Sequence, residues 1–200
     1  NLLQQMNLRN IKNLVFSSSC TVYGQPEILP VCENSPVQTA MSPYGNTKQI
    51  SEEIISDFIH AQEDFKAIAL RYFNPIGAHE SALIGELPIG VPQNLVPYIT
   101  QTAIGIRPKL RIFGGDYNTL DGTCIRDYIH VVDLAKAHIC ALERMIQNKC
   151  INRFEVFNIG TGSGFSVLEI VKTFEKISHQ KLNYEIVERR TGDIEKVWAD

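Results

Sequence analysis

The sequence lacks the features that commonly identify proteins that bind nucleic acids, membranes or metals. Its formal net charge is −3 and it contains no basic tract, so we expect no nucleic-acid partner. No apolar run reaches the length needed to cross a bilayer, so we expect no membrane association. The five cysteines form no Cys-x-x-Cys pair and no spacing typical of zinc, which favours reduced thiols in a cytoplasmic protein without a metal ion.

The rest of the composition is that of an ordinary globular protein. Hydrophobic residues make up 44% and charged residues 20% of the 200 residues, which is enough for a sizeable core in one or two domains. The sequence begins at Asn1, without a methionine or a signal peptide, and it stops at Asp200 without a terminating element. We therefore expect an internal fragment of a longer protein.

Apolar segments alternate with amphipathic segments along the chain. Near-continuous apolar runs predict buried strands, and apolar residues spaced by three or four predict helices. The expected strands cover residues 13–19, 66–72, 110–113, 124–130, 154–159 and 184–187. The expected helices cover residues 1–10, 43–59, 95–104, 131–146 and 167–177. This alternation predicts an α/β fold with a doubly wound parallel sheet.

Capping residues and glycines predict where several of these elements begin and end. Asn94 is placed to cap the helix that follows it, and Ser166 with Glu169 forms the pattern of a capping box. The glycines at 160, 162 and 164 follow a strand, but their spacing does not match a Gly-x-Gly-x-x-Gly dinucleotide motif. We expect a tight strand-to-helix turn there.

Tyr44 and Lys48 form a candidate acid–base pair in the first turns of an expected helix. Residues four apart share a helix face, with Cβ atoms about 5–6 Å apart. A nearby ammonium lowers a tyrosine pKa of about 10, which lets the phenol exchange protons. Ser19 ends the preceding strand, where α/β sheets bind ligands, and its hydroxyl can share the proton. Without further motifs, the simpler interpretation is favoured, with a turn serine, a half-buried tyrosine and a solvated lysine.

Longer motifs favour the chemical interpretation. They are Phe-Ser-Ser-Ser-Cys-Thr-Val-Tyr-Gly (16–24), Ser-Pro-Tyr-Gly-Asn-Thr-Lys (42–48), Arg-Tyr-Phe-Asn-Pro-Ile-Gly-Ala-His (71–79), the segment 115–131 and Trp-Ala-Asp (198–200). In this order they resemble the extended short-chain dehydrogenase/reductases, and within them the UDP-glucose 4-epimerase family. The resemblance runs from end to end of the chain. It implies a Rossmann-like fold whose first strands and glycine-rich turn would precede Asn1.

The resemblance implies NAD-dependent interconversion of UDP-glucose and UDP-galactose through a 4-keto sugar. Tyr44 would take the proton from the sugar 4-hydroxyl, and Ser19 would hydrogen-bond the same oxygen. Lys48 would lower the pKa of Tyr44 and bind the nicotinamide ribose. The implied NAD contacts are Ser17, Ser19, Tyr44, Lys48 and Phe73.

Residues that match the UDP-sugar contacts of this family are spread over the whole chain. They are Ser19, Tyr44, Asn74, Asn94, Leu95, Arg111, Phe113, Arg126, Arg190, Asp193 and Val197. The resemblance implies that Arg126 and Arg190 hold the diphosphate, because guanidinium groups bind phosphates bidentately. Asp193 would hold the nucleotide ribose, and Arg189 has the weaker claim as a ligand.

Two positions bear on the choice of substrate and reaction. Related sugar dehydratases carry an Asp-Glu pair where this chain has Cys20 and Thr21, so we do not expect dehydration. Val197 stands where family members often have a tyrosine or a small residue beside the sugar C2 group. A UDP-N-acetylglucosamine 4-epimerase or another nucleotide-sugar epimerase is therefore an alternative. A non-catalytic nucleotide-sugar-binding protein is a second alternative, of a different class.

The resemblance also implies how the chain is divided and how it assembles. Residues 1–75 would form the C-terminal part of the NAD-binding domain, and residues 76–200 mainly a substrate-binding region. Within the latter, the segment of about 120–160 would return to the NAD-binding domain. The whole protein would form a homodimer through the helix at 1–10 and the Tyr44 helix.

Overall fold

The computed structural model describes residues 1–200 and has an α/β architecture. Three parallel strands form its first sheet in the order β1-β2-β6. These strands are β1 (Asn13–Ser17), β2 (Lys66–Tyr72) and β6 (Phe154–Ile159). The central strand β2 is apolar over most of its length and is buried from residue 67 to residue 71. A strand covered on both faces reads as a continuous apolar run, which is why the sequence predicted its bounds well.

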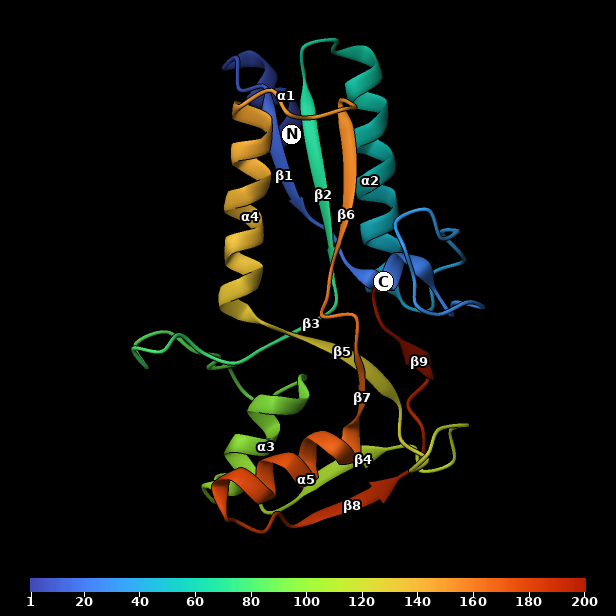
Figure 1. Cartoon of the computed structure of the whole chain (residues 1–200), viewed down its shortest axis with the longest axis vertical. Coiled ribbons are helices and arrows are strands. Elements are labelled where there is room, and N and C mark those ends of the chain that lie inside the picture. The colour runs from blue at the N-terminus through green and yellow to red at the C-terminus, as the bar shows by residue number, and fades with distance from the viewer.

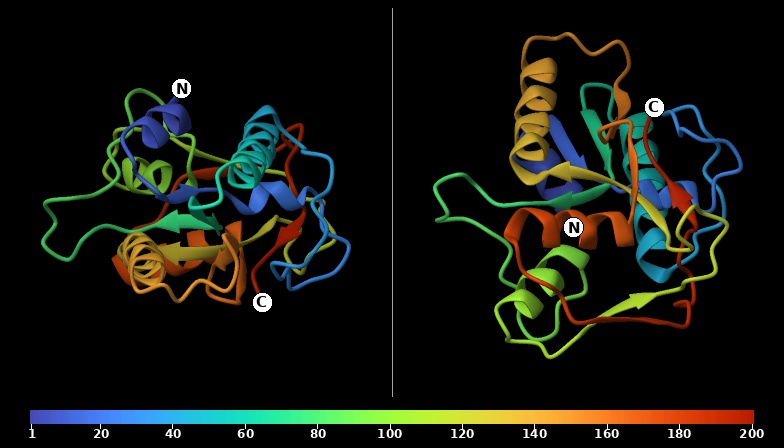
Figure 2. Two further views of the ribbon diagram at one scale, coloured as in Figure 1. Left: turned by 90° about the horizontal axis from the view of Figure 1, so that it is seen from above. Right: turned by 60° about the horizontal axis from the view of Figure 1, so that its bottom comes forward.

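Helices cover both faces of this sheet, as Figure 2 shows from above. On one face, α1 (Leu2–Leu8) and α2 (Pro43–Ala61) pack around Ala67 and Phe65. On the other face, α4 (Val131–Ile146) packs on Ile68 and its neighbours. Alternate residues of β2 thus enter different cores, because side chains along a strand point to opposite faces.

A second region lies beyond the carboxyl ends of the first sheet (Figure 1). The antiparallel pair of β5 (Ile125–His130) and β7 (Gly164–Ser166) is extended by parallel pairing of β5 with β3 (Asn74–Ile76) and with β9 (Lys196–Val197). Below it, β4 (Leu110–Phe113) and β8 (Tyr184–Val187) pair in parallel. Helices α3 (Leu95–Ala103) and α5 (Val167–Ser178) complete this region.

The second region has its own core between α3, α5 and the β4–β8 pair. Ile99, Leu110, Ile112, Val171 and Leu182 form one buried cluster. The segment between β3 and α3 projects from the side of the molecule (Figure 1). It carries several exposed apolar side chains, so its chain direction is set by its glycines and prolines and not by burial.

Most elements lie within a few residues of the predicted bounds, and the differences have local explanations. The short helix η1 (Cys20–Tyr23) and the strands β3, β7 and β9 were not predicted, because such short elements carry no periodic signal. Ser166 and Glu169 form the predicted capping box. Gly162 adopts φ +74° in the predicted turn before α5. Asn94 precedes α3 but makes no side-chain cap, because its amide donates to Glu86 Oε1 at 2.7 Å.

No helix in the structure combines the length and the apolar character needed to cross a membrane. The structure also contains no group of three or more histidine, cysteine, aspartate or glutamate side chains arranged to hold a metal ion.

Candidate active site

The predicted catalytic residues lie where β1 ends and α2 begins. Ser42 caps α2, accepting a hydrogen bond from the Gly45 N–H at 3.1 Å, and Pro43 occupies the first turn. Tyr44 and Lys48 follow in the first two turns. Local sequence therefore fixes the start of the helix, and with it the placement of both side chains.

Lys48 joins the helix to the end of β1. Its Nζ donates to the Ser17 backbone carbonyl at 2.9 Å. The same ammonium lies 5.3 Å from the ring centroids of Phe16 and Tyr44. Ser19 is nearly buried and its Oγ accepts from the Thr21 N–H at 3.3 Å, so it also caps η1. The structure therefore brings the predicted trio to one place at the carboxyl edge of the sheet.

The Tyr44 phenol is half exposed and has a perturbed acidity. Burial raises the pKa of Tyr44 above its ordinary value and the neighbouring Tyr72 adds to this, whereas hydrogen bonding by Ser19 lowers it. The net direction is upward, which differs from the predicted lowering by Lys48. The physical reason is that the ammonium is directed to the Ser17 carbonyl and faces the ring, while desolvation acts on the phenol itself.

Ser17, a predicted NAD contact, is tied to the opposite helix layer. Its Oγ lies 3.0 Å from His138 Nε2, and His138 Nδ1 lies 2.9 Å from the Leu134 carbonyl. Ser17 therefore contributes its carbonyl to Lys48 and its side chain to α4. Any contact of Ser17 with the cofactor would also have to be made at the carboxyl end of β1.

Six of the predicted substrate residues meet in a cavity of about 270 Å³ in the second region. The cavity lies between the start of α3, strand β4 and the segment that precedes β9. Its lining includes the predicted residues Asn94, Leu95, Arg111, Phe113, Arg190 and Asp193. Val91, Tyr98, Ile112, Cys124 and Val167 add apolar or weakly polar walls. Sequence positions about a hundred residues apart thus share one site.

Arg111, Arg190, Asp193 and Phe113 line this cavity, and Arg126 lies beside it without lining it. Arg190 donates to both oxygens of Asp193, at 2.9 and 3.0 Å. Arg126 Nη2 lies 3.8 Å from Asp193 Oδ1, which adds a second positive charge. The guanidinium carbons of Arg190 and Arg111 lie 4.8 and 5.7 Å from the centroid of the Phe113 ring. Basic groups beside an aromatic face suit a ligand that combines phosphates with a planar base.

The charge of Arg190 is secured by its partner. Burial works to lower the pKa of Arg190, but the hydrogen bonds and the charge of Asp193 outweigh it and raise the pKa. Arg189, the weaker candidate, is similarly exposed but has a different partner, because it donates to Asp116 Oδ1 at 2.7 Å. Its guanidinium covers Tyr117 at 4.0 Å from the ring centroid. The structure therefore distinguishes two adjacent arginines that the sequence alone could only rank.

Two predicted contact residues are placed inside the core and not on a cavity wall. Phe73 is 3% exposed and Val197 is 1% exposed, and both belong to a cluster with Cys20 and Tyr23. The Val197 side chain therefore does not line the cavity described above, contrary to the expectation of a roomy wall beside a sugar. Strand β9 buries it because its backbone pairs with β5, where Val197 is opposite Arg126.

Asn74 lies at the start of β3 and pairs with Tyr128 of β5. The next residue, Pro75, helps to line a second hollow of about 230 Å³, together with Ile76, Val131 and Asn94. Because Asn94 also lines the first cavity, the two hollows share a wall. Asn94 thus lines both hollows, whereas Asn74 lines neither of them.

Sequence reasoning gave no role to three buried polar residues near the site. Ser18 is fully buried between Ser17 and Ser19, Glu52 lies on α2 one turn after Lys48, and Arg71 is buried in β2. The available signal was an arginine inside an otherwise apolar strand, because a buried charge requires a partner. The buried Asp127 likewise received no role from the sequence. It accepts hydrogen bonds from the Thr161 N–H and hydroxyl.

Comparison with known proteins identifies the family of the chain. The sequence profile of the NAD dependent epimerase/dehydratase family matches residues 1–160. The chain belongs to this family. UDP-glucose 4-epimerase of Pasteurella multocida is 51% identical over 199 residues, which cover 100% of this chain and 58% of that protein. The human UDP-glucose 4-epimerase is also 51% identical over 199 residues, with 100% and 56% covered.

Solved structures give the same family relationship. UDP-glucose 4-epimerase from Bifidobacterium longum, in complex with NAD⁺ and UDP, has a TM-score of 0.93 and 45% identity. The match covers 100% of this chain and 58% of that one. The fold is thus Rossmann-like and is that of the epimerase/dehydratase family. The chain spans between half and two thirds of the length of these relatives.

Proposed function

We propose that the protein containing this chain interconverts UDP-glucose and UDP-galactose through a 4-keto sugar, with NAD as its cofactor. The observation that carries the proposal is the cavity that brings Asn94, Arg111, Phe113, Arg190 and Asp193 together. These residues come from separate segments, and each was expected to contact a UDP-sugar before any geometry was known. The high identity to UDP-glucose 4-epimerases over the whole chain adds support.

The proposed roles in the cavity follow from charge and shape. Arg126 and Arg190 bind the diphosphate, because paired guanidinium groups neutralise phosphates through short charge-assisted hydrogen bonds. Phe113 packs against the uracil ring, and Asp193 accepts hydrogen bonds from ribose hydroxyls while it holds Arg190. The nucleotide is thereby anchored far from the reacting carbon, which leaves the sugar free to change its orientation.

The proposed chemistry takes place at the end of β1. Tyr44 exchanges a proton with the sugar 4-hydroxyl in both directions, and Ser19 hydrogen-bonds the same oxygen throughout. NAD, held by residues at this edge such as Ser17, Ser19 and Lys48, would supply the hydride acceptor and donor for the sugar C4. A half-exposed phenol beside a nearly buried serine suits this exchange with a substrate.

The residues at this edge fit the nicotinamide end of NAD. Ligands of parallel α/β sheets bind beyond the carboxyl ends of the strands, where Ser17, Ser19, Tyr44 and Lys48 gather. The Lys48 ammonium can hydrogen-bond ribose hydroxyls while it stays close to the phenol. The Phe73 side chain is buried, so we propose that this residue meets the cofactor through its backbone.

The test uses the intact natural protein, purified without added cofactor. UDP-galactose is added, and UDP-glucose formation is followed together with nicotinamide absorbance. Conversion without net release of NADH is the expected result, because hydride taken from the sugar returns to it. Tyr44→Phe is the control, since it keeps the ring but removes the proton acceptor.

The alternatives predict other results in the same assay. Conversion of UDP-N-acetylglucosamine but not of UDP-galactose would identify an epimerase for N-acetylated sugars. No turnover of either sugar, combined with binding of UDP, would identify a nucleotide-sugar-binding protein and overturn the proposed activity. The burial of Val197 gives no support to a widened pocket, so we favour the glucose and galactose pair.

We also propose that the whole protein forms a homodimer through α1 and α2. Ile50 and Ile54 are 44% and 54% exposed on α2, and Leu2 and Leu8 of α1 are 67% and 77% exposed. Exposed apolar residues on adjacent helices commonly mark an interface. Light scattering on the intact protein tests this, with a double Ile50→Glu, Ile54→Glu variant expected to be monomeric.

A further inference from the structure

A buried ion pair connects the helix of Tyr44 and Lys48 to the sheet. Arg71 Nε donates to Glu52 Oε1 at 3.0 Å and Arg71 Nη2 donates to Glu52 Oε2 at 2.6 Å. Arg71 is 6% and Glu52 8% exposed. Glu52 lies four residues after Lys48 and eight after Tyr44, so the pair is on the same side of α2 as the predicted catalytic residues.

The same carboxylate reaches the tripeptide that carries Ser19. Ser18 Oγ donates to Glu52 Oε1, and Ser18 is completely buried. On the residue before it, the Ser17 carbonyl accepts from Lys48 Nζ. Two successive residues of the β1 end are therefore attached to α2, one to the predicted catalytic lysine and one to Glu52. The residue that follows is Ser19.

Further hydrogen bonds fix the other side of the ion pair. Arg71 Nη1 donates to the Tyr23 hydroxyl at 3.1 Å, and the Tyr23 hydroxyl donates to Asn158 Oδ1 at 2.7 Å. Burial works to lower the pKa of Arg71, but Glu52 and Tyr23 outweigh it and raise the pKa, so the guanidinium stays charged. The pair is consequently anchored in β2, η1 and β6 as well as in α2.

A second pair of the same geometry exists far from the site. Arg144 of α4 donates to both oxygens of Glu155 in β6, at 2.6 and 3.0 Å, and Glu155 is 8% exposed. It has the same residue types and an equally buried carboxylate, although the Arg144 side chain is 30% exposed against 7% for Arg71. None of its hydrogen bonds is made to Ser17, Ser18 or Lys48. The contact with the β1 end is therefore what sets the Glu52–Arg71 pair apart.

We propose that Glu52 is a positioning residue for proton transfer in the proposed reaction. Arg71 holds its carboxylate, and the carboxylate holds Ser18. These two contacts fix the position of Ser19 relative to Tyr44 along the axis of α2. Catalytic groups need to be held within about 0.5 Å of their working geometry, and buried networks that are fully hydrogen-bonded supply such rigidity. The inference rests on the proposed function.

Ser18→Ala in the intact protein is the direct test. The variant removes only the hydroxyl that meets Glu52, while the bidentate contact of Glu52 with Arg71 stays intact, so folding is retained. We expect kcat with UDP-galactose to fall about ten-fold, because small displacements of reacting groups are costly. KM is expected to stay unchanged, because the UDP cavity is built from other elements. An unchanged kcat would overturn the proposal.

Glu52→Gln and Glu155→Gln separate positioning from general destabilisation. Each variant removes the charge of one buried pair with almost no change of shape. We expect both to lower the melting temperature, but only Glu52→Gln to lower kcat in assays run well below that temperature. Equal loss of kcat in both variants would mean that destabilisation alone explains the effect.

Phenol titration keeps this test independent of the proposed activity. The ultraviolet difference between the parent and Tyr44→Phe isolates the ionisation of Tyr44, whether or not the protein turns over UDP-sugars. Hydrogen bonding by Ser19 lowers the Tyr44 pKa, so a displaced Ser19 raises it. We expect Ser18→Ala to shift the titration to higher pH and Glu155→Gln to leave it in place. An unshifted titration in Ser18→Ala would contradict the positioning role even in an inactive protein.

Discussion

The end of β1 with the start of α2 and the cavity beside β4 are built in different ways. At the β1 end, Tyr44 and Lys48 are neighbours on one helix, and Ser19 lies two residues after the strand as the cap of η1. In the cavity, Asn94, Arg111 and Asp193 come from three segments that together span about a hundred residues of the chain. The first site depends on one helix being held against one strand, whereas the second depends on the packing of the whole second region.

This difference has a chemical counterpart. At the first site, one ammonium and one phenol lie near neutral hydroxyls, so small movements change proton exchange. At the cavity, Arg126 and Arg190 both pair with Asp193, and a charged ligand would replace part of these contacts with its own. We therefore expect substitutions at the first site to change kcat and substitutions in the cavity to change affinity. The predictions below test this division.

The largest effect is expected for Tyr44→Phe. Removing a general acid–base group lowers kcat by a factor of about 10² to 10⁴. Binding of UDP, measured by calorimetry, is expected to stay unchanged because the phenol is not part of the cavity lining. A Tyr44→Phe variant that loses UDP affinity as strongly as kcat would break the comparison.

Arg190→Leu is expected to have the next largest effect. It removes a cation that lines the cavity and leaves Asp193 with Arg126 alone. Hydrogen bonds to charged groups contribute about 1.5–3 kcal/mol, so UDP affinity is expected to fall about 10- to 150-fold. Arg189→Leu is the matched control, because the adjacent arginine is paired with Asp116 outside the cavity lining. Equal losses in the two variants would refute the assignment of Arg190.

Phe113→Ala tests the aromatic wall and is expected to weaken UDP binding more modestly. Aromatic and cation–π contacts are each worth about 0.5–1.5 kcal/mol, which corresponds to a loss of about two- to ten-fold. Phe113→Leu restores apolar packing but not the ring face. If the ring contacts the base, both variants weaken UDP, whereas recovery in the leucine variant would assign Phe113 to packing alone.

Glu155→Gln should leave both sites unaffected and change only stability. Arg144 is the main cause that lowers the pKa of Glu155, from an ordinary value of 4.5 to about 2. Because the folded-state pKa is the lower one, the pair stabilises the protein above pH 4.5 and loses this contribution as the pH falls toward about 2. The melting-temperature difference from the parent is therefore expected at pH 7 and should shrink toward pH 3. A constant difference would contradict this linkage.

The two regions also differ in how far the sequence could predict them. The predicted bounds of β2, β4, β6, β8 and α4 agree with the observed ones, because the apolar periodicity that predicts these elements is local. To predict where Tyr44 and Lys48 lie, it was enough to recognise a helix cap, a proline and the helical periodicity that follows them. Strands β7 and β9 could not be predicted, since each is only two or three residues long and exists through its pairing with β5.

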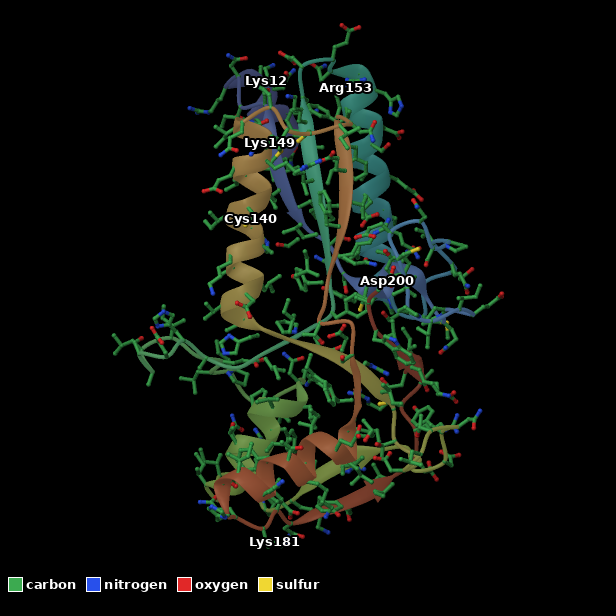
Figure 3. The ribbon with its side chains drawn as sticks, viewed as in Figure 1. Lys12, Cys140, Lys149, Arg153, Lys181 and Asp200 are labelled. Atoms are coloured by element: carbon green, nitrogen blue, oxygen red, sulfur yellow. The ribbon has the colours of Figure 1, made fainter.

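Side-chain environments were harder to predict than residue identity. Phe73 and Val197 were expected near ligands, but they pack into one buried cluster that joins the start and the end of the chain. Asp200, the last residue, donates its N–H to the Val31 carbonyl beside this cluster, and Figure 3 shows it below the start of α2. Such long-range contacts are decided by which surfaces meet after folding, and no local pattern encodes them.

The sequence by itself determined the α/β alternation, the helix that carries Tyr44 and Lys48, and the set of residues suited to a nucleotide sugar. Periodicity, caps and residue chemistry are properties of short segments, so they can be read without coordinates. Only the tertiary structure decided that Arg190 and not Arg189 lines the cavity, that Val197 is buried, and that Glu52 and Arg71 support the end of β1. These facts depend on distances between segments far apart in the chain, and folding alone brings those segments together.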